Sequence, residues 1–415
     1  MRFSIVFMSN IFQICVEGNT GSTGRIAEEI GISAMQQGWE SYIAFGRFPR
    51  PSKSKTIRIG SDLAVFCHGL ETRFFDRHCL GSKTATIRLV KQIESIKPDI
   101  IHLHHLHGYY INIEILFNYL AKAAISVVWT FHDCWSITGH CAHFDYIGCD
   151  KWKTECNHCP QTKEYPASLW FDRSTKNYRL KKKLFTSVQN MVIVTPSHWL
   201  ANIVKESFMQ SIPVQIIHNG IDTSVFKPQI NHRETREKYH IGERFVILGV
   251  ANPWTQKKGF DDFIALSKLL SKDDVIVLVG LDKSQIKQLP KNIIGLTKTE
   301  NRQELVDLYS AADLFVNPTW EDNFPTTNIE SLACGTPVVT YRTGGSIEAV
   351  SPETGFIVDK GDINSLVEIV RSVKVTGKLA YTASCRKRAV DFFSKNDRFA
   401  EYMVLYENLL RQKNG

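Results

Sequence analysis

The feature that most limits the fold of this chain is a repeated succession of apolar run, turn and amphipathic helix. Residues 11–16 form an apolar run, residues 18–24 a glycine-rich turn, and apolar positions within residues 26–34 recur with helical spacing. Further apolar runs typical of buried strands lie at residues 42–45, 99–103, 127–131, 191–195, 245–250, 275–279, 314–316 and 337–340. Helical spacing recurs at residues 260–270, 303–311, 327–334 and 365–373. This order predicts an α/β fold with doubly wound parallel sheets.

The length and one internal turn predict how the chain divides. A chain of 415 residues fits two large domains or three small ones. A turn signal at residues 218–222 separates the two series of strands and helices. We therefore expect two Rossmann-like domains, residues 1–218 and 219–395, which face each other across a cleft. A C-terminal helix at residues 396–415 is expected to pack back onto the first domain.

Composition excludes several classes of protein. With 43% hydrophobic and 22% charged residues, the chain is not disordered, collagen-like or a coiled coil. Its net charge of +8 favours an anionic partner: nucleic acid, nucleotide phosphates or a membrane face. No stretch reaches the roughly 18 apolar residues of a membrane span. The apolar run at residues 2–8 ends without a cleavage site, so we expect a soluble, unexported, cytoplasmic chain. Residues 1–8 are expected to be an extension, with Met8 as an alternative start.

Two segments have the pattern of a phosphate-binding turn. Gly21 and Ser22 lie between a predicted strand and a predicted helix, where backbone N–H groups can approach a phosphate. The turn is neither Gly-x-Gly-x-x-Gly nor a P-loop, and a plain tight turn is the alternative. In the second half, Asp322 follows a strand, a helix begins near Thr327, and Glu330 lies about one turn into it. Such a helix start suits a diphosphate and the carboxylate suits ribose hydroxyls, with a capped helix and a solvated glutamate as the alternative.

Several segments together resemble family-4 retaining glycosyltransferases of the GT-B fold. Asp322-x7-Glu330, followed by residues 334–339, is similar to the acidic signature of that family. The other matching segments, in chain order, are Gly21-Ser22, residues 219–222, Phe226-x-Pro228, residues 257–259 and residues 343–348. Residues 97–104 and 129–135 resemble the branch found in capsule and colanic-acid polysaccharide clusters. The order of the segments matches over nearly the whole chain, which is more specific than any single motif.

The resemblance implies a role for each matching residue. His132 would contact the donor sugar, with its backbone carbonyl facing the positive charge that develops at the anomeric carbon. Lys258 would pair with the diphosphate, Asp322 would hold a hydroxyl of the donor sugar, and Glu330 would hold the ribose. The remaining donor-binding residues would be Gly21, Ser22, Lys257, Asn323, Phe324 and Thr327. Because a lysine and helix N-termini would neutralise the leaving group, no cofactor or metal is expected for the chemistry.

Two departures from the family pattern affect the donor site. Pro253 stands where the family usually has an arginine, five residues before Lys258, so one cation is missing and Lys257 is the nearest substitute. The usual Glu-Gly-Phe-Gly is replaced by residues 322–325, Asp-Asn-Phe-Pro. The identity of the donor sugar therefore does not follow from the motif.

Cysteines cluster in one window of 19 residues, although an even spread would place about 0.5 there. The four are Cys141, Cys149, Cys156 and Cys159. Cys156 and Cys159 have the C-x2-C spacing of structural zinc sites, and we consider a structural zinc ion alongside reduced thiols and disulfides. Reserve ligands are His140, His143 and His158. Four further histidines could suggest a second metal, but packing at strand ends and a role in the acceptor cleft are favoured; these are His102, His104, His105 and His107.

Taken together, the sequence predicts a retaining, hexosyltransferase-type enzyme of polysaccharide (capsule or exopolysaccharide) biosynthesis. It would move a sugar from a nucleotide-diphosphate sugar to a growing glycan, with an acceptor linked to a lipid diphosphate. Basic clusters at residues 47–58 and 181–183 suggest peripheral binding to the inner face of the cytoplasmic membrane. The alternatives are a zinc-containing nucleic-acid-binding protein and a nucleotide-sugar epimerase of the same fold. Nucleic acid is not the expected partner, because the basic residues are scattered.

Overall fold

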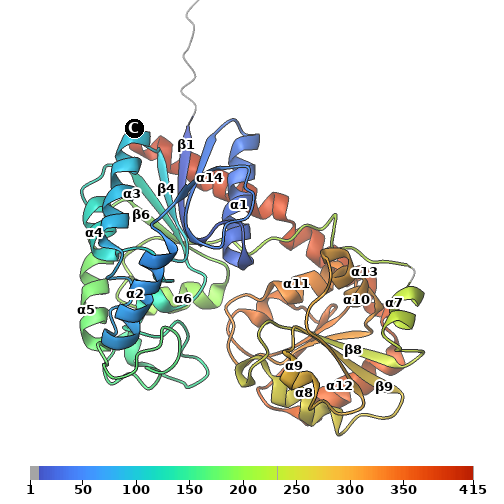
Figure 1. Ribbon diagram of the computed structural model, residues 1–415. Coiled ribbons are helices and arrows are strands. Elements are labelled where there is room, and N and C mark those ends of the chain that lie inside the picture. The colour runs from blue at the N-terminus through green and yellow to red at the C-terminus, as the bar shows by residue number, and fades with distance from the viewer. Residues whose placement is uncertain (1–8, 231, 415) are drawn as a thin grey trace, which may run out of the picture. The chain divides into compact units, whose positions relative to one another are not determined.

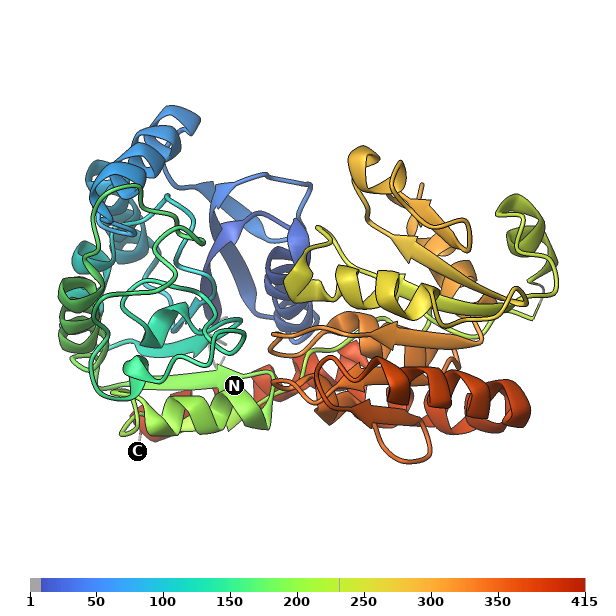
Figure 2. The ribbon, with the colours of Figure 1, turned by 90° about the horizontal axis from the view of Figure 1, so that it is seen from below.

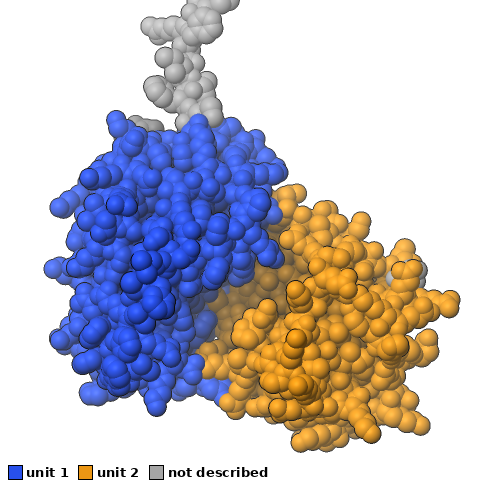
Figure 3. Space-filling model, viewed as in Figure 1, with its two compact units in different colours: residues 1–217, 398–415 blue, residues 218–397 orange. Residues whose placement is uncertain are grey.

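The computed structural model describes residues 9–230 and 232–414. The chain forms two compact units, residues 1–217 with 398–415, and residues 218–397 (Figure 3). Each unit contains one parallel sheet with helices on both faces, which confirms the predicted α/β fold class. The expected N-terminal extension and the alternative start at Met8 lie outside the described residues.

The first unit is built on a seven-stranded parallel sheet in the order β3-β2-β1-β4-β5-β6-β7 (Figures 1 and 2). Its strands are β1 (Asn10–Glu17), β2 (Glu40–Arg47), β3 (Lys55–Arg58), β4 (Ile100–Leu103), β5 (Ser126–Thr130), β6 (Met191–Thr195) and β7 (Val214–Ile216). In β1, Ile14 pairs with Ala44 of β2 on one side and with Leu103 of β4 on the other. The strand order reverses between β1 and β4, and loops that leave such a point diverge to form a ligand crevice.

Helices cover both faces of the first sheet. They are α1 (Gly21–Gln36), α2 (Asp62–Phe75), α3 (Lys83–Ile96), α4 (Ile113–Leu120), α5 (Ser174–Phe185), α6 (His198–Glu206) and α14 (Lys395–Asn414), with short turns η1 (Trp135–Ile137) and η2 (Lys151–Lys153). Alternate residues of β1 serve the two faces, since Phe12 and Ile14 join the core that includes α3–α6 and Ile11 joins the core with α1 and α14. No helix within the described ranges has the combination of length and apolar character needed to cross a membrane.

The C-terminal helix α14 completes the core of the first unit. Phe399, Met403 and Tyr406 are buried against strand and helix residues of the N-terminal half. The Tyr406 hydroxyl hydrogen bonds with His102 Nδ1 at 2.6 Å, and His102 Nε2 hydrogen bonds with the Thr130 hydroxyl at 2.8 Å. The helix therefore satisfies a buried imidazole as well as covering an apolar face.

The second unit repeats the plan with six parallel strands in the order β10-β9-β8-β11-β12-β13. Its strands are β8 (Phe245–Val250), β9 (Asp274–Val279), β10 (Ile293–Leu296), β11 (Leu314–Asn317), β12 (Val338–Tyr341) and β13 (Gly355–Val358). Its helices are α7 (Arg233–Lys238), α8 (Phe260–Ser267), α9 (Lys283–Ile286), α10 (Arg302–Ala311), α11 (Thr326–Ala333), α12 (Ile363–Thr376) and α13 (Leu379–Phe393), with turns η3 (Gln256–Lys258) and η4 (Ser346–Ala349). Helices α10, α11 and α13 pack on one face and α8 and α12 on the other.

Four strands were not predicted from the sequence: β3, β7, β10 and β13. All four lie at or next to the edge of a sheet and are three or four residues long. β3 (Lys-Thr-Ile-Arg) is largely exposed, and β10 and β13 each contain a glycine. Such strands lack the continuous apolar run of a central parallel strand, so periodicity does not reveal them.

Replacing Tyr406 with phenylalanine should lower the free energy of unfolding of the first unit by about 1–3 kcal/mol, because His102 Nδ1 would remain buried without its partner. Replacing it with alanine should cost about 3–5 kcal/mol, since a cavity is added. Urea denaturation followed by circular dichroism measures both changes. Val404→Ala, at an exposed position of the same helix, is the control and should stay within about 0.5 kcal/mol. Equal losses in Tyr406→Phe and Val404→Ala would contradict the role given to the hydroxyl.

Candidate functional site

The acidic motif of the second unit lies at the carboxyl ends of the central strands. β11 ends at Asn317, a loop follows, and α11 begins at Thr326. The Asn317 side-chain amide donates to Asn328 Oδ1 at 2.8 Å, and Asn328 Nδ2 donates to the carbonyl and hydroxyl oxygens of Ser346 at 3.1 and 3.0 Å. These bonds hold the first turn of α11 against β11 and the turn η4. The first N–H groups of α11 are therefore held in a defined position.

Glu330 lies on α11 and is held by a buried tyrosine. The Tyr309 hydroxyl of α10 donates to Glu330 Oε2 at 3.1 Å. Burial, and then the neighbouring Glu330 carboxylate, hold the pKa of Tyr309 well above its usual range, so the hydroxyl keeps its proton. Glu330 is half-buried, and the tyrosine fixes one of its oxygens. A carboxylate held in this way is suited to accept hydrogen bonds from a pair of ligand hydroxyls.

The basic loop and the acidic loop are joined by two ion pairs. Lys258 Nζ lies 2.6 Å from Asp322 Oδ2, and Lys257 Nζ lies 3.2 Å from Glu321 Oε1. The Lys257 carbonyl also accepts the backbone N–H of Trp320 at 2.8 Å. The structure thus brings Lys257, Lys258 and Asp322 together, as a shared donor site requires. A ligand that carries both phosphate and hydroxyl groups could engage each partner of the Lys258–Asp322 pair without leaving a charge uncompensated.

A glycine and a buried aspartate allow these two loops to approach. Gly259 has φ +78°, and a Cβ atom there would lie 2.3 Å from the Pro318 carbonyl oxygen. Asp262, on α8, accepts hydrogen bonds from Trp320 Nε1 at 2.8 Å and from the Tyr341 hydroxyl at 2.9 Å. Gly259 therefore permits the close approach of the basic and acidic loops, and Asp262 holds the acidic loop through its hydrogen bond with Trp320.

The other residues expected at the donor site of the second unit differ in their burial. Thr327 is half-buried in the first turn of α11, beside the N–H groups that suit an anion. Phe324 belongs to the core, because its ring stacks on His218 at a centroid distance of 5.0 Å. Its carbonyl accepts the Asn219 side-chain amide at 3.3 Å, and Asn323 is buried beside it. The side chains of Asn323 and Phe324 are therefore both withdrawn from solvent.

Pro253 takes the place of the arginine expected from the family pattern, and it is exposed. Trp254 is buried and its Nε1 donates to the Val279 carbonyl at 2.8 Å. A proline cannot supply the positive charge that an arginine would provide at this position. Lys257 is the neighbouring cation, and it is already directed toward Glu321.

In the first unit, Gly21 and Ser22 are the first residues of α1. Gly21 has φ +64°, and a Cβ atom there would lie 2.2 Å from Glu17 Oε2. A Cβ atom at Gly24 would lie 2.9 Å from the Glu17 carbonyl oxygen. The glycines let α1 begin directly against the end of β1, at the point where the strand order reverses.

His132 follows β5 and belongs to a chain of hydrogen bonds that sets its tautomer. Gln13 Nε2 donates to the Ala27 carbonyl at 2.8 Å, so Gln13 Oε1 is the atom that accepts from His104 Nε2 at 3.0 Å. His104 Nδ1 then accepts from His132 Nε2 at 3.2 Å. Burial, and then the neighbouring histidines, hold the pKa of His132 and of His104 well below the usual range, so both rings are neutral. The bare nitrogen of His132 is therefore Nδ1.

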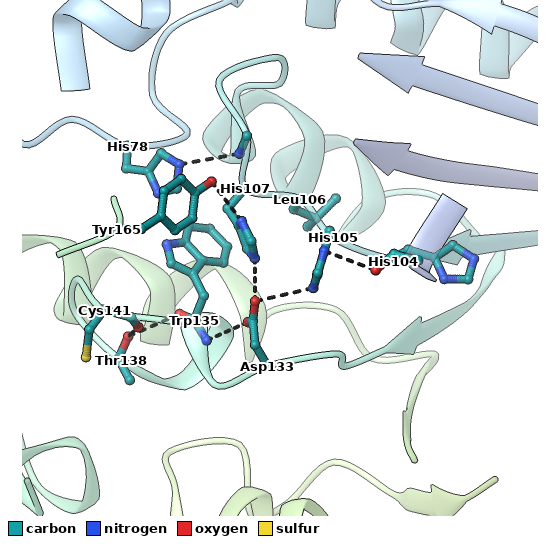
Figure 4. A network of polar contacts seen from close by, with 12 residues as sticks. His78, His104, His105, Leu106, His107, Asp133, Trp135, Thr138, Cys141 and Tyr165 are labelled. Carbon is teal, nitrogen blue, oxygen red and sulfur yellow. Dashed lines mark hydrogen bonds and ion pairs between the residues drawn. The ribbon is translucent and has the colours of Figure 1, made fainter. Parts of the chain in front are cut away.

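Next to His132, one carboxylate joins two further histidines (Figure 4). Asp133 Oδ2 lies 2.6 Å from His107 Nε2 and 3.3 Å from His105 Nε2, while Asp133 Oδ1 accepts the Trp135 N–H at 2.9 Å. His107 Nδ1 in turn hydrogen bonds with the Tyr165 hydroxyl at 3.0 Å. Burial alone would raise the pKa of Asp133. The neighbouring His107 and His105 instead hold this pKa well below its usual range.

Three ligand atoms of this cluster lie within 4.8 Å of one another, as a metal site would require. However, the distance of 2.6 Å between His107 Nε2 and Asp133 Oδ2 is that of a direct hydrogen bond. The cluster is thus a hydrogen-bonded set that fixes the chain immediately after His132. His102 is fully buried, in agreement with the packing role expected for it.

The four clustered cysteines lie in the segment between β5 and α5. All four line one small cavity, and all are free thiols. The Cys141 thiol donates a hydrogen bond to Cys159, which raises the pKa of Cys141 and lowers that of Cys159 to about 7. The reserve ligand His140 lines the same cavity, whereas His143 and His158 do not.

Several residues that shape these sites were not singled out from the sequence: Gln13, Asp262, Tyr309 and Asn328. Tyr309 and Asn328 occupy buried positions of helices, where their spacing is that of ordinary core residues. Gln13 is a polar residue inside an apolar strand, and that contrast is a signal that could have identified it. Asp262 offered no such signal, because an aspartate in a first helical turn is common.

Two family models match the chain in succession. The model described as Glycosyltransferase Family 4 matches residues 23–225, and the model described as Glycosyl transferases group 1 matches residues 244–373. Together they span most of the chain, and each falls largely within one of the two units.

Individual proteins show the same similarity. WcaC of Escherichia coli (strain K12), named for colanic acid biosynthesis, is 24% identical over 426 residues, covering 96% of this chain and 100% of WcaC. The UDP-Gal:alpha-D-GlcNAc-diphosphoundecaprenol alpha-1,3-galactosyltransferase of Escherichia coli is 26% identical over 227 residues, 51% of this chain and 58% of that enzyme. HepE of Anabaena, solved in complex with UDP, has a TM-score of 0.68 at 16% identity, covering 97% of this chain and 100% of HepE. The chain belongs to the group 1 and family 4 glycosyltransferases and has their GT-B fold.

Proposed function

We propose that this glycosyltransferase moves a sugar, with retention of configuration, from a nucleotide-diphosphate sugar to a growing polysaccharide. The observation that carries the proposal is the Lys258–Asp322 pair, which places a cation and a hydroxyl-binding carboxylate 2.6 Å apart. Glu330, one helical turn into α11, belongs to the same loop-and-helix segment. A cation, a helix N-terminus and two carboxylates match the groups of a nucleotide-diphosphate sugar: diphosphate, sugar and ribose.

The leaving group is proposed to be neutralised by protein groups alone. Lys258 and the first N–H groups of α11 would receive the diphosphate, and Lys257 would substitute for the cation that Pro253 cannot supply. Glu330, oriented by Tyr309, would accept hydrogen bonds from the ribose. Fixed positive charge at a departing phosphate stabilises the transition state without a metal ion.

Retention is proposed to follow from attack on the face that the diphosphate leaves. The bond between the anomeric carbon and the phosphate oxygen breaks as the bond to the acceptor oxygen forms. The acceptor hydroxyl gives its proton to the departing phosphate oxygen, so no protein base is consumed. In support, Asp322 and Glu321 are each paired with a lysine, which disfavours either of them as a covalent nucleophile.

His132 is proposed to hold the donor sugar as a neutral imidazole. Its Nε2–H is committed to His104, which leaves Nδ1 to accept a hydrogen bond from a sugar hydroxyl. The backbone carbonyl of His132 would face the positive charge that develops at the anomeric carbon. A neutral ring suits this position, because an imidazolium would oppose that charge.

We further propose that the acceptor is a glycan on a lipid diphosphate carrier. Two relatives support this: WcaC is named for colanic acid biosynthesis, and the Escherichia coli galactosyltransferase is named for a diphosphoundecaprenol acceptor. Such an acceptor would place the enzyme at the cytoplasmic face of a membrane.

One of the two basic clusters expected to bind that membrane is only partly at the surface, because Lys182 and Lys183 are exposed but Lys181 is not. Lys181 is buried, and its Nζ donates to the Trp135 and Thr138 carbonyls at 2.7 and 3.0 Å. In the other cluster, Lys55 and Arg58 are paired with Glu40 and Asp62. Basic charge alone is therefore a weaker basis for membrane binding than the sequence suggested.

An apolar surface of the first unit supports membrane binding instead. On α2, Leu63, Phe66 and Leu70 are exposed at helical spacing, and Phe66 is 62% exposed. The inward face of this helix carries small or polar residues, including His68 and Thr72. The stripe continues into the segment after Tyr165, because Phe74 stacks on Trp170 at a centroid distance of 5.3 Å. A helix with its apolar face outward is typical of binding in the membrane interface.

Replacing Lys258 or Glu330 with alanine should each lower kcat/KM for sugar transfer by about 10²–10³-fold, because each loses a charge-assisted contact to the nucleotide diphosphate. Transfer from labelled nucleotide-sugars, with thermal shift to identify the donor, measures the loss. Lys268→Ala and Glu368→Ala, exposed in the same unit, are matched controls expected to stay near wild type. Near-normal rates for Lys258→Ala would refute the donor site, and a product of inverted anomeric configuration by NMR would refute retention.

His132→Ala should lower kcat by about 10²-fold with little change in the acceptor KM, because the contact is made at the reacting sugar. The pKa of His132 lies well below its usual range, so the neutral ring persists as the pH rises from about 6 to 8. The kcat of the wild type should therefore show no inflection from His132 in this interval. An effect confined to the acceptor KM would show that His132 contacts the acceptor instead.

Phe66→Asp and Trp170→Asp should each reduce binding to vesicles of phosphatidylglycerol and phosphatidylcholine by about tenfold or more, since each places a charge in the apolar stripe. Co-sedimentation at low salt measures bound protein. Leu379→Asp, at an exposed apolar position of the second unit, is the control and should bind like wild type. Wild-type protein that ignores such vesicles would contradict the membrane-linked acceptor.

A further inference from the structure

The segment between β5 and α5 is ordered with almost no regular secondary structure. From residue 134 to residue 173 it contains only the turns η1 and η2 within the described part of the chain. A segment of this length inside a compact unit needs another source of order, because its backbone receives little support from helices or strands. One end of it carries Asp133 and Trp135, and Tyr165 near the other end contacts His107.

The four cysteines of this segment converge on one cavity of about 20 Å³. This volume holds a single water-sized occupant. The Cys141 thiol donates to Cys159, the Gly139 N–H donates to Cys156, and the Gln161 N–H donates to Cys159. A backbone N–H group directed at sulfur favours the thiolate over the thiol, although burial of Cys156 acts in the opposite direction. Gly139 is required here, because a Cβ atom would lie 2.1 Å from the Ser174 carbonyl oxygen and 2.8 Å from Cys156 Cβ.

Two buried polar groups near the four cysteines favour negative charge at the cavity: His140 lines it, and Lys181 lies close to the cysteines outside its lining. His140 is buried and lines the cavity; its Nδ1 bonds to Asp76 Oδ1 at 2.7 Å, and its Nε2 has no hydrogen-bond partner among the described residues. Lys181 is also buried, with its Nζ on the Trp135 and Thr138 carbonyls and 3.4 Å from the centre of the Trp135 ring. Burial lowers the pKa of Lys181 to about 7, and negative charge nearby, on Asp133 or on thiolates, favours its charged form.

We propose that this cavity is a structural zinc site whose ligands are the thiolates of Cys141, Cys149, Cys156 and Cys159. A zinc ion with four thiolates carries a net charge of −2, which would favour the charged form of the buried Lys181 and suits the direction of the backbone N–H groups. His140 lies against the coordinated sulfurs, outside the ligand set, and is held by Asp76 as groups around metal sites usually are.

The four sulfur atoms have to move closer together to bind the ion. No three of them lie within 4.8 Å of one another in the part of the chain that is described. Zinc–sulfur bonds of about 2.3 Å in a tetrahedron require sulfur atoms about 3.8 Å apart. Rotation about the Cα–Cβ bonds redirects each thiol, and the backbone already places all four around the cavity.

Zinc at this position would link the cysteine segment to the histidine site. The ion would join residues 141 and 159, and Tyr165 follows six residues after the last ligand. Tyr165 holds His107, and His107 holds Asp133 next to His132. Zinc would thus position the end of β5 from a distance without touching the substrate.

Elemental analysis of the full-length protein, purified under reducing conditions, tests the proposal. We expect about one zinc per chain in the wild type and at least a fivefold lower content in Cys149→Ser, Cys156→Ser and Cys159→Ser, with a lower Tm. Cys67→Ser and Cys385→Ser are matched controls outside the segment and should keep the metal. Cobalt added to the zinc-depleted protein should produce the intense visible bands of a tetrahedral tetrathiolate site, a readout independent of activity.

Three results would overturn the proposal. Wild-type protein that contains no zinc, takes up none on addition and has an unchanged Tm would show that the cysteines are ordinary thiols. A titration that finds six or eight reactive thiols in place of ten after denaturation without reductant would show disulfides. Loss of zinc in His140→Gln together with its retention in Cys149→Ser would refute the four-thiolate ligand set.

Discussion

Parallel pairing of the strands is the constraint on which the rest of this structure depends. In each sheet all strands run the same way, so every strand ends at the same edge. The strand order reverses beside β1 in one unit and beside β8 in the other, and the loops that leave these points diverge. Residues from distant segments, such as Lys258 and Asp322, meet at this edge because each lies in a loop that follows a strand of the same parallel sheet.

Charge balance within each unit determines the surroundings of the residues proposed to bind the donor. In the second unit, Lys257 and Lys258 are neutralised by neighbouring carboxylates before any ligand is present. A polyanionic ligand can exchange these pairs for its own, which avoids leaving a buried charge alone. In the first unit the same requirement is met with neutral groups, since burial keeps His104 and His132 unprotonated. The second unit therefore relies on paired charges, whereas in the first unit neutral imidazoles lie beside the Asp133 carboxylate, which accepts hydrogen bonds from its neighbours.

Hydrogen bonds from surrounding residues determine the tautomer or the orientation of the side chains within each site. Gln13 sets the tautomer of His104 and through it that of His132, while Tyr309 orients Glu330. These supporting residues are buried, so their bonds operate with little competition from water. Loops that contain no regular structure can hold a catalytic geometry when such partners are present.

The sequence by itself determined the α/β class, the central strands and the family, because continuous apolar runs and the spacing between Asp322 and Glu330 are local patterns. It did not reveal the edge strands such as β3, which lack an apolar run, nor the roles of Gln13 and Tyr309, whose partners are distant in the chain. It also misplaced Lys181, since a run of lysines gives no sign of which one faces inward. Only the tertiary structure decided these points, because burial and hydrogen-bond partners are properties of the packed chain.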